Sequence, residues 1–260
     1  MELSLTTFLI VCPLVFLAGF VDSIAGGGGV ISLPAYFLAG LPPYLAAGTN
    51  KFVACLGTLT STVKYFRSGK VQLFRALCTG VGSLIGGAAG AAAALHIPEN
   101  ILHGMILIAL PLVAVFLSIK RDFGADGGKE VAFSSAKIAV IAFGIGLLIG
   151  GYDGLVGPGT GTFLILAYAG ILGTDLLTAS GCAKVGNLCS NIASLTVYLF
   201  GGKVLFALAI PAAAFCMLGN YLGARYAIKG GSKNVKKIMF VVLGLLFAKF
   251  ILELFGVKFG

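Results

Sequence analysis

Apolar segments separated by short polar stretches make up almost the whole of this chain. They cover residues 5–21, 30–41, 44–66, 72–95, 98–119, 134–151, 160–173, 175–200, 204–228 and 235–255. Only 10% of the 260 residues are charged, whereas soluble domains carry about 25%, so this chain cannot cover a water-facing surface with polar side chains. Because several segments reach the ~20 residues that a spanning helix needs, we predict an all-α integral membrane protein with about 8–10 membrane segments.

Two glycine-rich breaks interrupt the apolar sequence. The first glycine break carries four consecutive glycines at 26–29, and the second carries the sequence GPGTGT at 157–162. The apolar segments that follow them are shorter than a spanning helix, so we expect broken or re-entrant helices after both breaks. A nucleotide-binding loop is a poor alternative, because GPGTGT lacks the Lys-Ser/Thr of a P-loop and no βαβ pattern surrounds it.

The two breaks belong to an internal repeat. When the chain is aligned with itself, Asp22 falls on Asp153 and, after a two-residue gap, Lys51 falls on Lys184. We therefore expect a first membrane repeat at 1–119, a linker at 120–133 and a second membrane repeat at 134–260. Each repeat holds five apolar segments, and this odd number inverts the second repeat relative to the first. Re-entrant hairpins at the breaks would leave the parity unchanged.

The net charge of +9 has the distribution of a membrane orientation signal rather than of a nucleic-acid-binding surface. Lysines and arginines cluster at 64–75, 120–137 and 225–237, which fall on one side of the predicted topology, whereas the other side holds little beyond Lys203 and Lys258. By the positive-inside rule, the linker is cytoplasmic and both termini are extracytoplasmic. We predict a multi-pass protein of the cell (inner) membrane that does not bind nucleic acid.

Cysteine and histidine give no sign of a metal or cofactor site. Six cysteines lie in apolar runs without a CxxC motif, and the chain has only two histidines. Small hydrophobic packing residues explain these cysteines best. We expect no metal, no cofactor and no catalytic residues, and we do not expect an enzyme.

Four ionisable residues lie near the breaks, inside apolar sequence. A lysine at the centre of a membrane helix costs about 2.5–3.5 kcal/mol on insertion scales, so Lys51 and Lys184 need a partner, a cavity or a permeating ion. We expect them to attract an anion to the middle of the membrane. Asp22 and Asp153 have three open roles: pairing with the lysines, capping the broken helices, or taking up a coupling proton.

The glycine breaks favour an anion as the ligand. Glycine lets the backbone approach a ligand closely, and the N–H groups at the start of the next helix attract negative charge. Close helix packing is the alternative role for these glycines, and interhelical hydrogen bonding is the alternative for each polar residue of 49–61 and 184–194. The residues expected to bind the substrate are Gly26, Gly27, Gly28, Gly29, Thr49, Asn50, Lys51, Gly157, Gly159, Thr160, Lys184, Asn187 and Asn191.

These motifs resemble one known family. FVDSIAGGGGVISLP and GTNK in the first repeat, with YDGLVGPGTGTF, AKVGN and GGKV in the second, are similar to the TauE/SafE family of sulfite exporters and, within it, to the YfcA-like branch. The resemblance covers nearly the whole chain. It implies an inner-membrane permease for small sulfur-containing anions: sulfite, sulfonates, sulfoacetate or thiosulfate-like species. The functional regions implied are Asp22 to Gly29, Thr49 to Lys51, Asp153 to Thr160 and Lys184 to Asn191.

One departure separates the two repeats: residues 181–184 read GCAK where the first repeat has GTNK, so the halves need not contribute equally. We predict a secondary transporter with alternating access around a midplane site, and an anion channel on the same site is the alternative. The partners expected are a small sulfur oxyanion or sulfonate, the lipid bilayer and a coupling proton at the aspartates.

Overall fold

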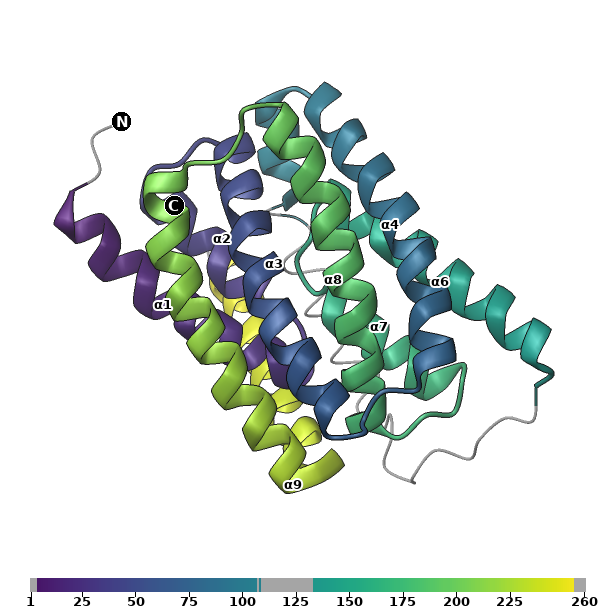
Figure 1. The fold of residues 1–260 in the computed structure, drawn as a ribbon. Coiled ribbons are helices and arrows are strands. Elements are labelled where there is room, and N and C mark those ends of the chain that lie inside the picture. Colours follow the sequence, from purple (N-terminus) through teal and green to yellow (C-terminus); the bar gives the residue numbers. More distant parts are fainter. Residues whose placement is uncertain (1–3, 107, 109–132, 255–260) are drawn as a thin grey trace.

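The computed structural model of the protein describes residues 4–106, 108 and 133–254 (Figure 1). All regular structure in these residues is helical. The helices are α1 Leu5–Ala25, α2 Gly29–Leu38, α3 Pro43–Arg67, α4 Leu73–His96, α6 Ser135–Leu155, α7 Thr160–Gly170, α8 Leu176–Phe200 and α9 Phe206–Leu254. Residues 99–106 are also helical. Nearly all of the expected linker at 120–133, and most of the segment expected at 98–119, lie outside the described residues.

The prediction of an all-helical membrane protein is confirmed for the described part of the chain. Four helices there are long and apolar enough to cross a membrane: α1, α4, α6 and the Phe206–Met239 part of α9. The 25-residue helices α3 and α8 have the length to cross but are more polar, because each carries a buried lysine and several hydroxyl or amide side chains. α3 packs against α8 and α9, and α8 also packs against α4, α6 and α7.

Two helices continue past the ends of their apolar runs. The apolar sequence predicted ends near residues 21 and 151, but α1 continues to Ala25 and α6 to Leu155. These extra turns contain Asp22 and Asp153, whose carboxylates meet lysines inside the protein. A polar residue ends an apolar run without ending a helix when its partner lies in the interior. At the other end of the chain, α9 consists of two helices separated by a kink at Gly231 (φ 64°), which correspond to the segments expected at 204–228 and 235–255.

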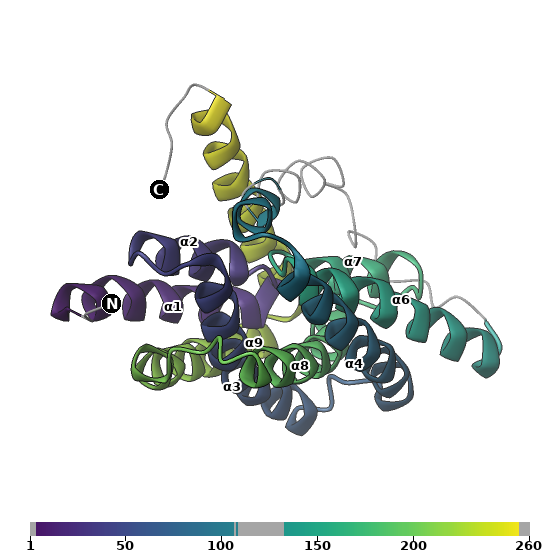
Figure 2. The ribbon, with the colours of Figure 1, turned by 90° about the horizontal axis from the view of Figure 1, so that it is seen from above.

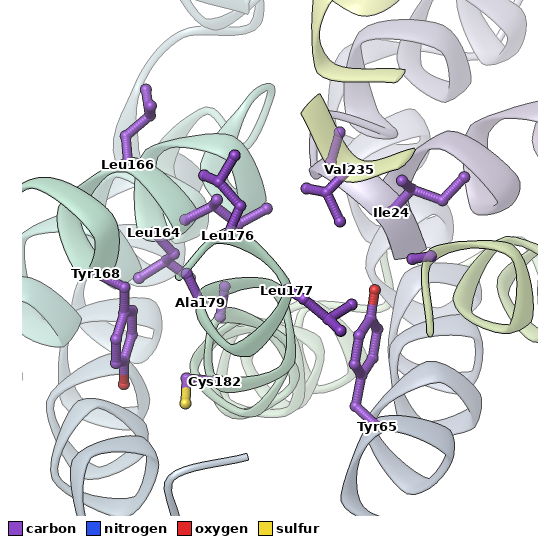
Figure 3. Packing of buried hydrophobic residues seen from close by; sticks show 14 of the residues in the cluster. Ile24, Tyr65, Leu164, Leu166, Tyr168, Leu176, Leu177, Ala179, Cys182 and Val235 are labelled. Atoms are coloured by element: carbon purple, nitrogen blue, oxygen red, sulfur yellow. The ribbon is translucent and has the colours of Figure 1, made fainter. Parts of the chain in front are cut away.

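Each of the long helices α1, α3 and α4 in the first half of the chain packs against a helix of the second half. α3 and α8 lie side by side at the centre, while α1 packs against α9 and α4 packs against α6 (Figures 1 and 2). A buried apolar cluster that includes Tyr65 and Tyr168 connects the centre with the short helix α7 (Figure 3). The hydroxyl of Tyr65 donates to Ser23 O at 2.9 Å, and Tyr168 shares a 2.7 Å hydrogen bond with Thr79 of the other half. Each half therefore completes the packing of the other.

Glycines set the distance at both of the outer helix crossings. An added Cβ on Gly86 of α4 would lie 2.1 Å from Leu147 O of α6, and one on Gly219 of α9 would lie 2.2 Å from Phe16 O of α1. These spacings leave no room for a side chain, so the backbones touch at both crossings. Small residues are the usual way for membrane helices to approach this closely, because hydrocarbon surroundings provide no hydrophobic driving force between them.

Candidate functional site

The two glycine breaks lie against each other in the interior. Gly26 has φ 76°, and a Cβ there would lie 2.1 Å from the backbone nitrogen of Thr162; a Cβ on Gly161 would lie 2.8 Å from Gly26 Cα. The hydroxyl of Thr162 donates to Ala25 O at 2.9 Å. The starts of α2 and α7, which are far apart in the sequence, therefore come together at one place.

A buried ion pair joins Lys51 of α3 to Asp153 of α6. The Nζ and Oδ2 atoms are 2.7 Å apart, and both side chains are almost fully buried. Asp153 also accepts hydrogen bonds from the hydroxyls of Ser190, at 2.6 Å, and Thr160, at 2.9 Å. Lys51 donates in addition to Asn191 Oδ1 at 3.3 Å. The carboxylate is thus held by three donors, two of which belong to its own half of the chain.

A second ion pair joins Lys184 of α8 to Asp22 of α1 at 2.7 Å. Lys184 is completely buried, whereas the Asp22 side chain is 17% exposed. The other carboxylate oxygen of Asp22 accepts from the backbone N–H of Gly28 at 3.2 Å, at the start of α2. Each aspartate therefore pairs with the lysine of the other half, and the four charges cancel.

A pocket lies between the two pairs and the two breaks. Its empty space is about 540 Å³, part of it open to solvent. Most of its lining residues are polar or small; they come from α1, α2, α3, α6, α8 and α9 and from both glycine breaks. The lining residues are Val15, Ala18, Gly19, Asp22, Gly27, Gly28, Gly29, Ser32, Asn50, Lys51, Val53, Ala54, Asp153, Gly157, Gly159, Thr160, Gly161, Asn187, Asn191, Cys216 and Asn220.

Two helix N-termini present free backbone donors at this pocket. The N-cap positions of α2 and α7 are glycines without a capping side chain. Within the described part of the chain, the N–H groups of Gly29 and Gly161 make no hydrogen bond, and both residues line the pocket. Unpaired N–H groups at helix starts carry partial positive charge. Together with Lys51 they create a region of the pocket wall that favours negative charge.

Most residues expected to bind substrate lie on this pocket, and three do not. Gly26 packs against the second break, Lys184 is buried behind Asp22, and the hydroxyl of Thr49 accepts from the N–H of Leu205 at 3.0 Å. Cys182, aligned with Thr49, accepts in the same way from the N–H of Gln72 at 3.2 Å. At this position the GTNK-to-GCAK departure therefore exchanges one acceptor for another at a contact between the halves, whereas at the next position Asn50 of the pocket is aligned with Ala183.

Two polar residues of the site were absent from the expected set: Ser32, which donates to Asn50 Oδ1 at 2.7 Å, and Asn220, which lines the pocket from α9. Ser190, which donates to Asp153, lies within the region expected at Lys184 to Asn191. Ser32 occupies apolar sequence, where a serine is unremarkable. Asn220 is the only asparagine of its membrane segment at 204–228, and an intramembrane polar residue of this kind is the signal that would have identified it.

Comparisons with known proteins agree with this membrane architecture. A family model described as Sulfite exporter TauE/SafE matches residues 11–250. A protein of Sinorhizobium sp named "Probable membrane transporter protein ORF9" is 35% identical over 239 residues, covering 92% of this chain and 89% of that protein. "Probable membrane transporter protein YfcA" of Escherichia coli (strain K12) is 30% identical over 240 residues, covering 92% and 88%. No solved structure matches the chain significantly.

Proposed function

This chain belongs to the sulfite exporter TauE/SafE family, and we propose that it is a secondary transporter for a small sulfur-containing anion such as sulfite or an organosulfonate. Its membership rests on the family model, which spans residues 11–250, and on relatives that are named membrane transporters. The protein is accordingly a multi-pass membrane transporter. The substrate and the mechanism are the parts that we propose from the site.

The chemistry of the pocket supports an anion as the transported ligand. Because the two lysines and two aspartates cancel, the net charge of the ion pairs does not choose between anions and cations. The choice comes from the unpaired N–H groups of Gly29 and Gly161, two residues that line the same pocket as Lys51. This meeting of two uncapped helix starts and a lysine in one buried pocket carries the proposal, since such donors hold small oxyanions well.

Matching contacts in the two halves support an inverted-repeat transport mechanism. Gly86 meets Leu147 as Gly219 meets Phe16, and the pairs Lys51–Asp153 and Lys184–Asp22 are related by the same alignment. In transporters built from inverted repeats, discontinuous helices meet at a midplane site and the two repeats exchange conformations around it. We assign the ligand to the junction of the two breaks, where access alternates between the two sides of the inner membrane. Both termini are extracytoplasmic and the linker is cytoplasmic in this scheme.

Flux into proteoliposomes tests the proposal. Purified protein should take up labelled sulfite in a saturable manner, and internal unlabelled sulfite should accelerate exchange. Lys51→Met should reduce this flux by about 100-fold, because it removes a charge-assisted donor worth roughly 1.5–3 kcal/mol together with the ion pair. Lys64→Met is the matched control, since Lys64 lies over the ring of Tyr221 near the end of α3 and does not line the pocket.

Three results would count against the proposal. Equal flux in Lys51→Met and in the unaltered protein would remove the assigned role of this lysine. Large currents that rise linearly with voltage, without counterflow, would identify an anion channel instead. Flux that is indifferent to a pH gradient would exclude a coupling proton at Asp22 or Asp153.

A further inference from the structure

One buried amide on the pocket wall is only half satisfied. Asn220 of α9 is 1% exposed and lines the pocket. Its Nδ2 donates to Cys216 O at 3.0 Å and also lies 3.4 Å from Cys216 Sγ. A backbone carbonyl only accepts hydrogen bonds, so this contact fixes which end of the amide is the nitrogen. The carbonyl oxygen, Oδ1, has no donor among the described residues.

Two neighbouring glycines provide the space that this amide occupies. A Cβ on Gly19 of α1 would lie 2.8 Å from Asn220 Nδ2, and a Cβ on Gly57 of α3 would lie 2.6 Å from it. In the other half of the chain, the position aligned with Asn220 is Gly87, which packs against Ser190. The asparagine is therefore a feature of one half, and the repeated architecture does not require it. Burying an amide oxygen without a donor costs about 1–3 kcal/mol, which favours a partner that arrives with the ligand.

The same side of the pocket carries a second acceptor. Asp22 lies one helical turn beyond Gly19 on α1, and its partly exposed carboxylate lines the pocket. The donors, by contrast, are Lys51 and the N–H groups of Gly29 and Gly161. The pocket thus presents both donors and acceptors to its contents. A simple anion would satisfy only the donors.

We propose that Asn220 is a specificity-determining residue whose Oδ1 accepts a hydrogen bond from the transported molecule. The substrate is then an anion that also carries a donor, an ammonium or hydroxyl group, a short distance from its anionic head. Among the sulfur compounds of the proposed function, on which this inference rests, aminosulfonates and hydroxysulfonates belong to this class. Alkylsulfonates without a donor do not.

Three ethanesulfonates provide the probe, because they share an anionic head and a two-carbon chain. Taurine ends in an ammonium group, isethionate in a hydroxyl and ethanesulfonate in a methyl group. Calorimetric titration of the full-length protein in detergent should give Kd values about tenfold or more lower for taurine and isethionate than for ethanesulfonate, as expected when the analogue leaves a buried acceptor unpaired. In Asn220→Leu the ratio of the Kd for ethanesulfonate to the Kd for taurine or isethionate should fall to about one, while the Kd for ethanesulfonate itself changes little.

Two further variants keep the test decisive. Asn234→Leu removes an amide that also donates to a backbone carbonyl, Tyr226 O, but lies away from the pocket, so its preference should match that of the unaltered protein. Asn220→Asp keeps an acceptor and adds charge, so it should shift the preference toward taurine over isethionate even if the leucine variant does not fold.

The outcomes separate this inference from the proposed function. If sulfite binds but the three ethanesulfonates bind equally, or if Asn220→Leu and Asn220→Asp keep the original preference, Asn220 does not select the substrate and the transporter proposal stands. If neither sulfite nor any ethanesulfonate binds, the proposed function itself fails, and this inference fails with it.

Discussion

The two lysine–aspartate pairs occupy aligned positions in the two halves, yet they meet the pocket differently. In the Lys51–Asp153 pair both residues line the pocket, and the carboxylate is held by Ser190 and Thr160 as well as by the lysine. In the other pair Lys184 is fully buried, and only its partner Asp22 reaches the pocket. The alignment therefore relates the two pairings, but only one lysine reaches the pocket. Under the proposed function, Lys51 offers a cation to the ligand and Asp22 offers a carboxylate.

The largest expected effect is on folding stability, and it comes from comparing alanine substitutions at one glycine of each break. Gly26 and Gly157 are aligned and both have positive φ, 76° and 93°. Alanine at either position pays about 1–2 kcal/mol for the left-handed backbone. At Gly26 the Cβ would also lie 2.1 Å from Thr162 N, whereas at Gly157 its nearest neighbour would be 3.4 Å away. Gly26→Ala should therefore yield no folded protein, and Gly157→Ala should fold with a lower melting temperature.

Thermal unfolding followed by circular dichroism measures this difference, and it is preferable to intrinsic tryptophan fluorescence because the chain has no tryptophan. Equal melting temperatures for the two alanine variants would show that the breaks do not press against each other as described.

Charge-neutral double variants should separate the tasks of the two ion pairs. Removing one partner of a buried pair costs about 3–5 kcal/mol because it strands the other charge, so both partners are changed together. Lys51→Met with Asp153→Asn should weaken sulfite binding by about 100-fold, because the pocket loses its cation. Lys184→Met with Asp22→Asn should weaken it by less than about tenfold, since Lys184 does not line the pocket.

Calorimetric titration with sulfite gives these two affinities. A reversed order of losses would mean that the ligand sits nearer Lys184, and the division of tasks between the pairs would then be wrong.

A smaller effect should follow from the support of Asp153. Ser190→Ala removes a 2.6 Å hydrogen bond to the carboxylate, and hydrogen bonds to charged groups contribute about 1.5–3 kcal/mol. Ser61→Ala is the control, because this buried hydroxyl bonds only to carbonyls of its own helix, at Thr58 and Gly57. Unfolding in detergent should show a clear loss for Ser190→Ala and little change for Ser61→Ala. Similar losses in both would indicate general packing damage.

The smallest effect is expected at the second position of the GTNK and GCAK motifs, where Thr49 is aligned with Cys182. Cys182→Thr reproduces Thr49, and a threonine hydroxyl can accept from Gln72 N–H as Thr49 accepts from Leu205 N–H. The melting temperature should change by an amount equivalent to less than about 1 kcal/mol, while Cys182→Ala, which removes this acceptor, should cost about 1–3 kcal/mol. A severe loss of sulfite transport in Cys182→Thr would instead give this position a role in the pocket.

The sequence allowed the helices, the breaks and the charged residues to be predicted because each is conspicuous in apolar surroundings. The pairing of each aspartate with the lysine of the other half could not be predicted in the same way. Asp22 lies closer in the sequence to Lys51 than to Lys184, and only the packing of α1 against α8 and α9 brings it to the distant lysine. The sequence predicts that the two lysines and two aspartates belong to one site. Which of them line the pocket depends on side-chain burial, and the spacing of these residues in the sequence does not determine that burial.

The ends of α1 and α6 illustrate a second limit. Hydropathy marks where lipid-facing sequence stops, and both helices continue beyond that point because their last turns are buried in protein. Asn220 illustrates a third, since its unpaired oxygen arises from the three-dimensional position of Cys216 and two glycines. An isolated asparagine in an apolar run does not reveal whether its amide is satisfied.

The long separation between Asp22 and Lys184 has a consequence for biosynthesis. These ion-pair partners are 162 residues apart, so at about 5–20 residues per second the ribosome needs roughly 8–30 seconds to make the lysine after the aspartate. During that interval Asp22 lacks its final partner, and an unpaired carboxylate is costly in hydrocarbon. The Lys184–Asp22 pair can form only after α8 has been made, so this part of the site is completed late in the life of the nascent chain.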